Sequence, residues 1–355
     1  MTFTALVAVS VAQLLFAILL SVFIFVHRRT AERRAREEAR GLAALQGPVR
    51  EWLVGEGSAE RVREGLSKLP ADTARYTALR IGRHNVAVEV RQEFAVIVRD
   101  APWVRDGLQQ IGSAWWWRRL EAARLLADLG TSADETRVRT LLRDPHPAVR
   151  AAATSCLRRI ASPAVIDVVL DELPAQPLVV RSHQMSMLRE QWELTRTALI
   201  RRLGPEAPVE KLPHWVNVAE VLEMPDVLAR VIPLHAHPVD EVRIAVARAL
   251  KKYFHPDAIW IVREMLEDPD WRVRAQAARS AGVLRDPSII DALEKRLSDS
   301  TWWVRFRSSL ALAQLGEPGR AALRNVRNSS DPFAAQMAVM VSGLSAGSIV
   351  ELIEG

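Results

Sequence analysis

Cysteine is nearly absent from this chain of 355 residues, in which Cys156 stands alone. One cysteine excludes an intramolecular disulfide and a cluster of thiolate ligands around a metal ion. Lysine is also scarce, with five of the 48 basic residues, and only two tyrosines accompany eleven tryptophans. The composition suits a reducing compartment, and the side chains available for binding are mainly arginine and tryptophan.

Motifs of catalysis and nucleotide binding are missing too. The sequence contains no phosphate-binding loop, glycine-rich dinucleotide turn, nucleophile elbow or zinc-protease motif. His235 and His237 lie two residues apart, without a third ligand at a spacing typical of zinc. The sequence therefore predicts no enzyme, no cofactor and no metal site.

Charge is absent from the first 26 residues, and Phe3 to Val26 is a run of 24 uncharged, mostly apolar residues. About 20 such residues are enough for a helix to cross a bilayer. Residues 27–40 then carry six arginines and three glutamates, and positive charge stays on the cytoplasmic side. A cleaved signal peptide would carry its positive charge before the apolar run. We expect a single transmembrane helix at 1–26 in the inner membrane, a basic juxtamembrane helix at 27–42, an amino terminus outside, and a cytoplasmic remainder.

The net charge beyond residue 40 is small. The whole chain carries +6, of which residues 27–40 contribute +3, so residues 41–355 carry the other +3. Binding of nucleic acid needs a concentrated basic face. This charge argues against nucleic acid as the partner.

A Val-Arg pair recurs along the chain at a fixed interval. The valines of five such pairs are separated by 31, 62, 31 and 31 residues: Val149, Val180, Val242, Val273 and Val304. A period of this size is typical of a stacked array of helical units. We expect a solenoid over 116–355, with an irregular central segment at about 190–225, and degenerate helical repeats over 43–115.

Each unit is predicted to be helix, turn, helix. After the Val-Arg pair, small or apolar residues recur at helical spacing, as in Val273, Ala277 and Ala281. A proline such as Pro163 or Pro287 then marks the start of the next helix, because its missing N–H would have no partner there. Neither helix can bury its apolar stripe alone, so the units must stack.

This pattern resembles the HEAT repeat, and its short period is similar to that of the bacterial repeats in phycobilin-lyase-type proteins. The resemblance rests on an aspartate six residues before the arginine of Val-Arg, followed by alanines and a leucine. It implies an all-α, right-handed α-solenoid. It also implies a polar ladder, in which aspartate and arginine bond between neighbouring units, formed by Asp144 and Arg150, Asp268 and Arg274, and Asp299 and Arg305. His237 and Ser330 replace the aspartate before Arg243 and Gln336, so we expect a weaker ladder at those junctions.

Aromatic residues gather where the helices carrying Val-Arg should begin. Four of them lie two residues before the pair or its equivalent: Trp116, Trp271, Trp302 and Phe333. The side chains of Trp115–Trp117 cannot all face one core, because helical neighbours point about 100° apart. Packing between units and an exposed interface both stay open for these residues.

We predict a membrane-tethered scaffold that binds a protein partner, itself part of a membrane complex. The candidate contacts are tryptophans and arginines of the repeats: Trp115, Trp116, Trp117, Trp302, Trp303, Arg124, Arg248 and Arg279. The three arginines share one position in the unit, on the helix that lines the concave face in HEAT proteins, and a solvated row is an equal alternative. Docking of the tryptophans on lipid, a lyase- or chaperone-like role on a cofactor-bearing protein, the oligomeric state and the partner's identity stay open.

Overall fold

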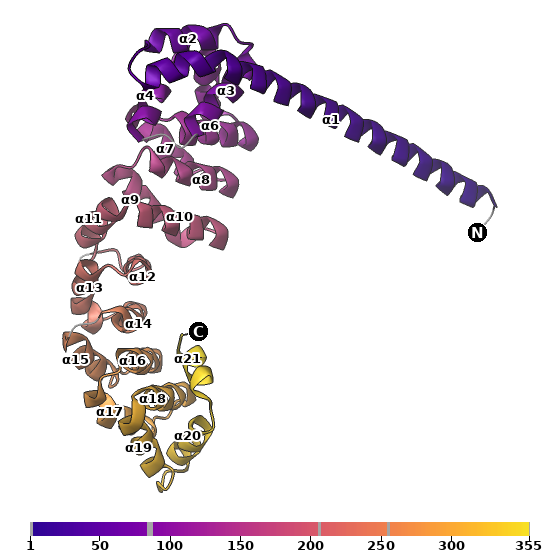
Figure 1. Ribbon diagram of the computed structural model, residues 1–355. Coiled ribbons are helices and arrows are strands. Elements are labelled where there is room, and N and C mark those ends of the chain that lie inside the picture. The colour runs from indigo at the N-terminus through magenta and orange to yellow at the C-terminus, as the bar shows by residue number, and fades with distance from the viewer. Residues whose placement is uncertain (1–2, 84–87, 205–206, 254–255, 355) are drawn as a thin grey trace. The chain divides into compact units, whose positions relative to one another are not determined.

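The structure, a computed structural model, describes residues 3–83, 88–204, 207–253 and 256–354. The side chains of some residues in these ranges lie outside the description: 3–12, 14, 34, 82–83, 88–89, 91, 256, 346 and 353–354. The described residues form helices and turns without a β-strand. They divide into two compact units, Met1–Ile160 and Ala161–Gly355. Apart from the long first helix of the chain, both units are built of short helices (Figure 1).

The helices of unit 1 are α1 (Phe3–Leu53), α2 (Ala59–Ser67), α3 (Ala71–Arg83), α4 (Val88–Val98), α5 (Pro102–Gln109), α6 (Trp116–Leu129), α7 (Glu135–Leu142) and α8 (Pro147–Thr154). Those of unit 2 are α9 (Pro163–Glu172), α10 (Leu178–Glu190), α11 (Trp192–Arg202), α12 (Leu212–Leu222), α13 (Pro225–Val231), α14 (Asp240–Ala249), α15 (Pro256–Met265), α16 (Trp271–Leu284), α17 (Ile290–Arg296), α18 (Trp302–Gln314), α19 (Gly316–Val326), α20 (Pro332–Ser342) and α21 (Ala346–Glu354). Short 3-10 turns extend or precede several of them.

Every second helix from α6 to α20 occupies the position of the Val-Arg pair, and we call these the Val-Arg helices. In unit 2 they begin at residues 178, 212, 240, 271, 302 and 332. Neighbouring Val-Arg helices pack on one another, as α14 does on α16 and α16 on α18. The helices between them form the second layer of an all-helical solenoid (Figure 1).

Small residues allow the Val-Arg helices to approach closely. The valine and alanines at helical spacing in α16, Val273, Ala277 and Ala281, are fully buried. A Cβ added to Gly282 would lie 3.0 Å from the Cα of Ala311 in α18. The apolar stripe predicted from the sequence is therefore the interface between consecutive repeats.

Helix α1 runs through both the predicted transmembrane segment and the predicted juxtamembrane helix at 27–42. Its C-terminal part packs on α2 and α3, where Leu45 is buried, whereas the described side chains between residues 15 and 33 are exposed. Among the described residues, we find no helix with the length and apolar character that a membrane crossing requires. The segment predicted at 1–26 lies partly outside that description, since the side chains of residues 1–12 and 14 are not included.

The central segment is helical but interrupted. The run from Leu178 to Leu203 is divided at Gln191, whose backbone leaves the helical conformation with φ −100° and ψ 46°, into α10 and α11. Trp215 of α12 is buried and donates from Nε1 to the main-chain oxygen of Leu170 at 3.3 Å. This tryptophan packs inside the unit rather than at its surface.

Candidate interaction surface

An aspartate-containing turn precedes three of the Val-Arg helices, α8, α16 and α18. In unit 2, Oδ1 of Asp268 accepts a hydrogen bond from the Asp270 amide at 2.8 Å, and Oδ1 of Asp299 accepts one from the Thr301 amide at 2.9 Å. Short polar side chains commonly fix turns in this way. After these turns, a tryptophan becomes the first residue of both α16 and α18.

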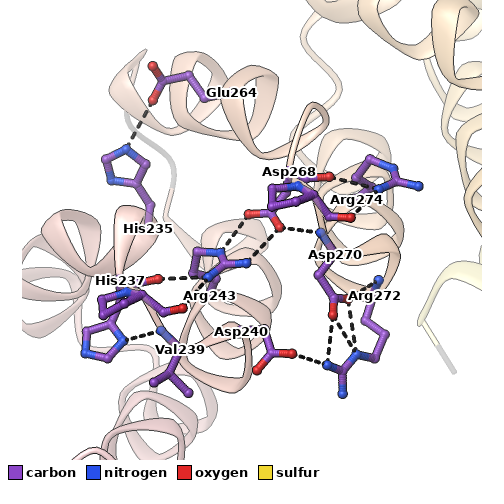
Figure 2. A network of polar contacts seen from close by, with 12 residues as sticks. His235, His237, Val239, Asp240, Arg243, Glu264, Asp268, Asp270, Arg272 and Arg274 are labelled. Atoms are coloured by element: carbon purple, nitrogen blue, oxygen red, sulfur yellow. Dashed lines mark hydrogen bonds and ion pairs between the residues drawn. The ribbon is translucent and has the colours of Figure 1, made fainter.

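The same carboxylates also accept hydrogen bonds from an arginine of the preceding repeat, and Figure 2 shows one such junction. Arg243 of α14 donates from Nε and Nη2 to Asp268 at 2.7 and 3.0 Å. Arg274 of α16 donates in the same manner to Asp299 at 2.7 and 2.9 Å. The remaining nitrogen, Nη1 of Arg243, donates to the main-chain oxygen of His237 at 2.9 Å. One guanidinium group thus links the turns of two consecutive repeats.

The aspartate and arginine that lie six residues apart do not form the side-chain ion pair that the sequence predicts. Asp144 pairs with Arg119 at 2.5 and 2.9 Å, while Arg150 donates from Nη1 to the main-chain oxygen of Asp144 at 2.7 Å. Arg274 likewise donates to the main-chain oxygen of Asp268 and gives its other nitrogens to Asp299. The paired side chains are 25 residues apart, which is the period of 31 less the spacing of six.

The side chains of Asp144 and Asp299 are only 5% and 3% exposed. Burial by itself would raise the pKa of Asp144 and of Asp299, since an ionised group is poorly solvated there. The hydrogen bonds from Arg119 and Arg274, together with those from nearby main-chain amides, outweigh burial and hold both pKa values below the ordinary range.

The ladder ends at Arg305. Its Nη1 donates to the main-chain oxygens of Asp299 and Ser300 at 2.7 and 3.0 Å, but its Nε is buried without a hydrogen-bond partner. The guanidinium instead lies 4.8 Å from the ring centroid of Phe333. This is one of the two junctions where the sequence predicts a weaker ladder.

At the other such junction, His237 stands where the aspartate would be. Its Nδ1 accepts a hydrogen bond from the Val239 amide at 3.1 Å and so holds the turn before α14 (Figure 2). The residue 25 positions earlier is Leu212, which is buried and whose side chain has no hydrogen-bond donor. The turn is preserved, and the link to the preceding unit is lost.

Aromatic side chains are exposed at the start of the last three Val-Arg helices. We call these residues the aromatic edge of unit 2: Trp271, Trp302, Trp303 and Phe333, with exposed fractions of 41%, 41%, 50% and 58%. Two of these rings contact each other: Trp302 meets Trp303 edge-on at 4.9 Å and also stacks on Phe306 at 4.8 Å. Ring-to-ring contact orders Trp302 and Trp303 without burying them.

Unit 1 has a similar cluster at the start of α6. All of Trp115, Trp116 and Trp117 are exposed. Trp116 stacks in parallel on His146, 4.0 Å away in the turn before α8, and Trp115 lies 4.6 Å from Trp117. Trp116 therefore contacts the next repeat and is still partly exposed.

The three arginines predicted as a basic row differ in exposure and in partners. Arg279 is 9% exposed, so it is part of the core. Arg248 bonds to the buried carboxylate of Glu220 at 2.8 Å and to Asn217 at 3.2 Å. Arg124 in unit 1 is exposed and bonds to Glu121. Arg279 of α16 is buried and Arg248 is bonded to a buried carboxylate, so the three arginines do not form one row of equivalent, exposed side chains.

Sequence reasoning missed a buried charge cluster in unit 1. Asp134 is fully buried and accepts bonds from Arg99 at 2.5 and 2.6 Å and from Arg137 at 2.7 Å. Burial alone would raise the pKa of Asp134, but the bonds from Arg99 and from the Thr131 amide keep it below its ordinary value. The spacing of Thr131 and Asp134, typical of a capping box, was the available signal.

Catalytic groupings are not apparent in the part of the chain that the structure describes. No cluster of three histidine, cysteine, aspartate or glutamate side chains suitable for a metal ion occurs among the described residues. His235 bonds to Glu264 at 3.1 Å (Figure 2) and to the main-chain oxygen of Ile232 at 2.9 Å. Cys156 is buried, and burial raises the pKa of its thiol, so it is a poor nucleophile.

HEAT repeats match this chain at residues 104–188 and 261–342. These two segments contain the Arg119–Asp144 and Arg274–Asp299 junctions of the polar ladder, whereas Arg243 of the third junction lies between them. The described helices form a solenoid of HEAT-like repeats. No curated protein sequence matches it.

The solved structures to which this chain is similar share little sequence with it. An Escherichia coli protein is 16% identical, with 81% of this chain and 98% of that one covered and a TM-score of 0.33. Kap121p bound to Nup53p is 12% identical over 80% of this chain and 43% of its own, with a TM-score of 0.38. The complex of CpcE and CpcF of phycocyanin lyase from a Nostoc species is 17% identical over 81% and 95%, with a TM-score of 0.27.

Proposed function

We propose that this protein is a membrane-tethered scaffold whose aromatic edge binds a protein partner in the same membrane. One observation carries the proposal, the exposure of Trp271, Trp302 and Phe333 at the same position of consecutive repeats, with exposed Trp303 next to Trp302. An all-helical solenoid of HEAT repeats is compatible with such a role.

Exposed tryptophan beside arginine is the composition of energetic hot spots at protein interfaces. Arg272 follows Trp271 directly and bonds to Asp240, Glu241 and Asp270, which gives the aromatic edge a polar border of both signs. Figure 2 shows the contacts of Arg272 with Asp240 and Asp270. The rings of Trp302 and Trp303 contact each other and Phe306, so covering these two rings costs little conformational entropy on binding.

The tether in this proposal is the segment 3–26, with 24 uncharged residues followed by an arginine-rich run. The exposed apolar side chains of α1, such as Phe16, Leu19 and Phe23, find no partner helix among the described residues. The arginines beyond residue 27 support an orientation with the repeats in the cytoplasm. Confinement to one membrane raises the effective concentration of the partner, so that a weak contact suffices.

Partner binding is tested by purifying the tagged full-length chain from its native membrane with the variants Trp302→Ala/Trp303→Ala and Trp115→Ala/Trp116→Ala/Trp117→Ala. The matched control is Trp260→Ala, an exposed tryptophan of α15 outside the Val-Arg helices. We expect one membrane protein to be captured with the native chain and the control, and to be lost with Trp302→Ala/Trp303→Ala. Loss of one hot-spot tryptophan typically costs 2 kcal/mol or more, about a thirtyfold weaker affinity.

A partner retained equally by all variants would place the interface elsewhere. A different outcome would favour lipid docking. In that case no protein is captured, and the native chain binds protein-free liposomes whereas Trp302→Ala/Trp303→Ala does not. The tether is tested separately by alkaline carbonate extraction of the membranes: release of the full-length chain into the soluble fraction would refute it without bearing on the aromatic edge.

A further inference from the structure

A second surface lies in unit 2, around the C-terminal ends of α16, α18 and α20. A cavity of about 490 Å³ opens there, lined by side chains of α18 to α21 and by the residue that follows α16. Its volume falls within the range of small-molecule sites, roughly 300–1,000 Å³. None of the residues of the aromatic edge lines it.

The lining of this cavity is strongly unbalanced in charge. It includes four arginines and no acidic residue: Arg285, Arg320, Arg324 and Arg327. The exposed carboxylate of Glu317, at the first turn of α19, bonds to Arg320 at 3.3 Å and to Arg324 at 2.6 Å. One carboxylate against four guanidinium groups leaves an excess of positive charge around the opening.

The floor of the cavity is apolar. Leu323 and Val341 are buried, and Leu344, Ile349 and Val350 are half-buried along the same surface. At one end, the amide oxygen Oε1 of Gln314 is buried without a hydrogen-bond partner. Because this oxygen only accepts hydrogen bonds, it does not contribute to binding an anion. A positively charged rim and an apolar floor thus lie in one place.

A further arginine lies on the same face of α18 as Gln314. Arg307 lies seven residues, or two helical turns, earlier, and its Nη1 is buried without a hydrogen-bond partner. Burial, together with the charge of Arg279, lowers the pKa of Arg307. Clustered arginines with an unused guanidinium nitrogen favour an anion in their vicinity.

We propose that this cavity binds a small anionic amphiphile, that is, a carboxylate or phosphate carried on an apolar body. The anionic group bonds to Arg285 and Arg327, which are not engaged by Glu317, and the apolar part lies on Leu323, Val341 and Ile349. The site is independent of the partner proposed for the aromatic edge, because the two share no residue.

The test uses the full-length chain in a neutral maltoside detergent, with an octanoate that carries a photoreactive diazirine as the probe. We expect crosslinks in peptides covering α19 to α21, prevented by octanoate and octyl phosphate but not by octylammonium or octanol. Arg285→Gln/Arg327→Gln should require about tenfold more probe for the same labelling, since two charge-assisted hydrogen bonds are lost at a partly screened rim. Arg230→Gln, an exposed arginine of α13, should leave the labelling unchanged.

Labelling at other positions, equal protection by octylammonium, or unchanged labelling of the double variant would each overturn the proposal. Protection by an acidic leucine–glutamate peptide, with none by octanoate or octyl phosphate, would also overturn it and identify a protein segment as the occupant. Both substituted arginines are exposed, so both variants should fold, which their circular dichroism melting curves will check.

Discussion

The link between α16 and α18 through Arg274 and Asp299 can be weakened with almost no change in volume. Asp299→Asn removes the negative charge and leaves an amide nitrogen that cannot accept a bond from Arg274. The side chain of Arg274 is only 12% exposed. Loss of one partner from a buried ion pair costs about 3–5 kcal/mol. Because Arg274 keeps its bonds to the main-chain oxygens of Asp268 and Pro269, we expect the lower end, about 3 kcal/mol.

Repeat proteins open locally between units, so hydrogen exchange of the α16 and α18 amides is the appropriate assay. A loss of about 3 kcal/mol corresponds to exchange faster by roughly a hundredfold. The matched control, Glu317→Gln, removes an exposed carboxylate that bonds to Arg320 and Arg324. Its effect should be too small to measure, as is usual for exposed ion pairs.

The effect of Asp299→Asn should also depend on pH. The folded-state pKa of Asp299 lies below its ordinary value, so its stabilisation is fully present above the unfolded-state pKa of about 3.9 and is lost as pH falls through the lower folded-state value. The native chain and the variant should therefore converge in strong acid. Equal exchange in Asp299→Asn and Glu317→Gln at neutral pH, or a difference that persists unchanged below pH 3, would refute the ladder argument.

Three further changes test other parts of the packing. Asp134→Ala should destabilise unit 1 by about 3 kcal/mol, because it leaves Arg99 with no counter-charge, and denaturation measured by α-helical circular dichroism will show this. Gly282→Val should cost about 2 kcal/mol or more through overpacking against Ala311, with faster exchange confined to α16 and α18; unchanged exchange would contradict the close approach. Cys156 should not react with iodoacetamide in the folded chain and should react once urea unfolds unit 1, as mass spectrometry will record; labelling in the native state would contradict its burial and its raised pKa.

The repeat could be predicted because stacking imposes a period on the chain. Small residues such as Ala277 and Ala281 must recur wherever consecutive helices approach, and an aspartate must precede each turn that it fixes. The same reasoning placed the aromatic residues at helix starts, since Trp271 and Trp302 follow those turns at a constant distance. Local spacing contains this information, and the sequence displays it directly.

The exposure and pairing of individual side chains could not be predicted in this way. Arg248 and Arg279 occupy equivalent positions, yet one is bonded to Glu220 and the other is buried, because neighbouring helices cover them differently. The partner of Asp134 is Arg99, 35 residues away in a region without the repeat signature.

The sequence by itself determined the helical unit, its period of 31 residues and the turns that begin at Asp268 and Asp299. These features depend on interactions within about ten residues, which the order of amino acids specifies. Only the tertiary structure decided that Arg274 bonds to the carboxylate of the following unit, that Arg305 turns to Phe333 instead, and that four arginines border one cavity. Such contacts depend on the distance and rotation between packed helices, which all the side chains of an interface fix together.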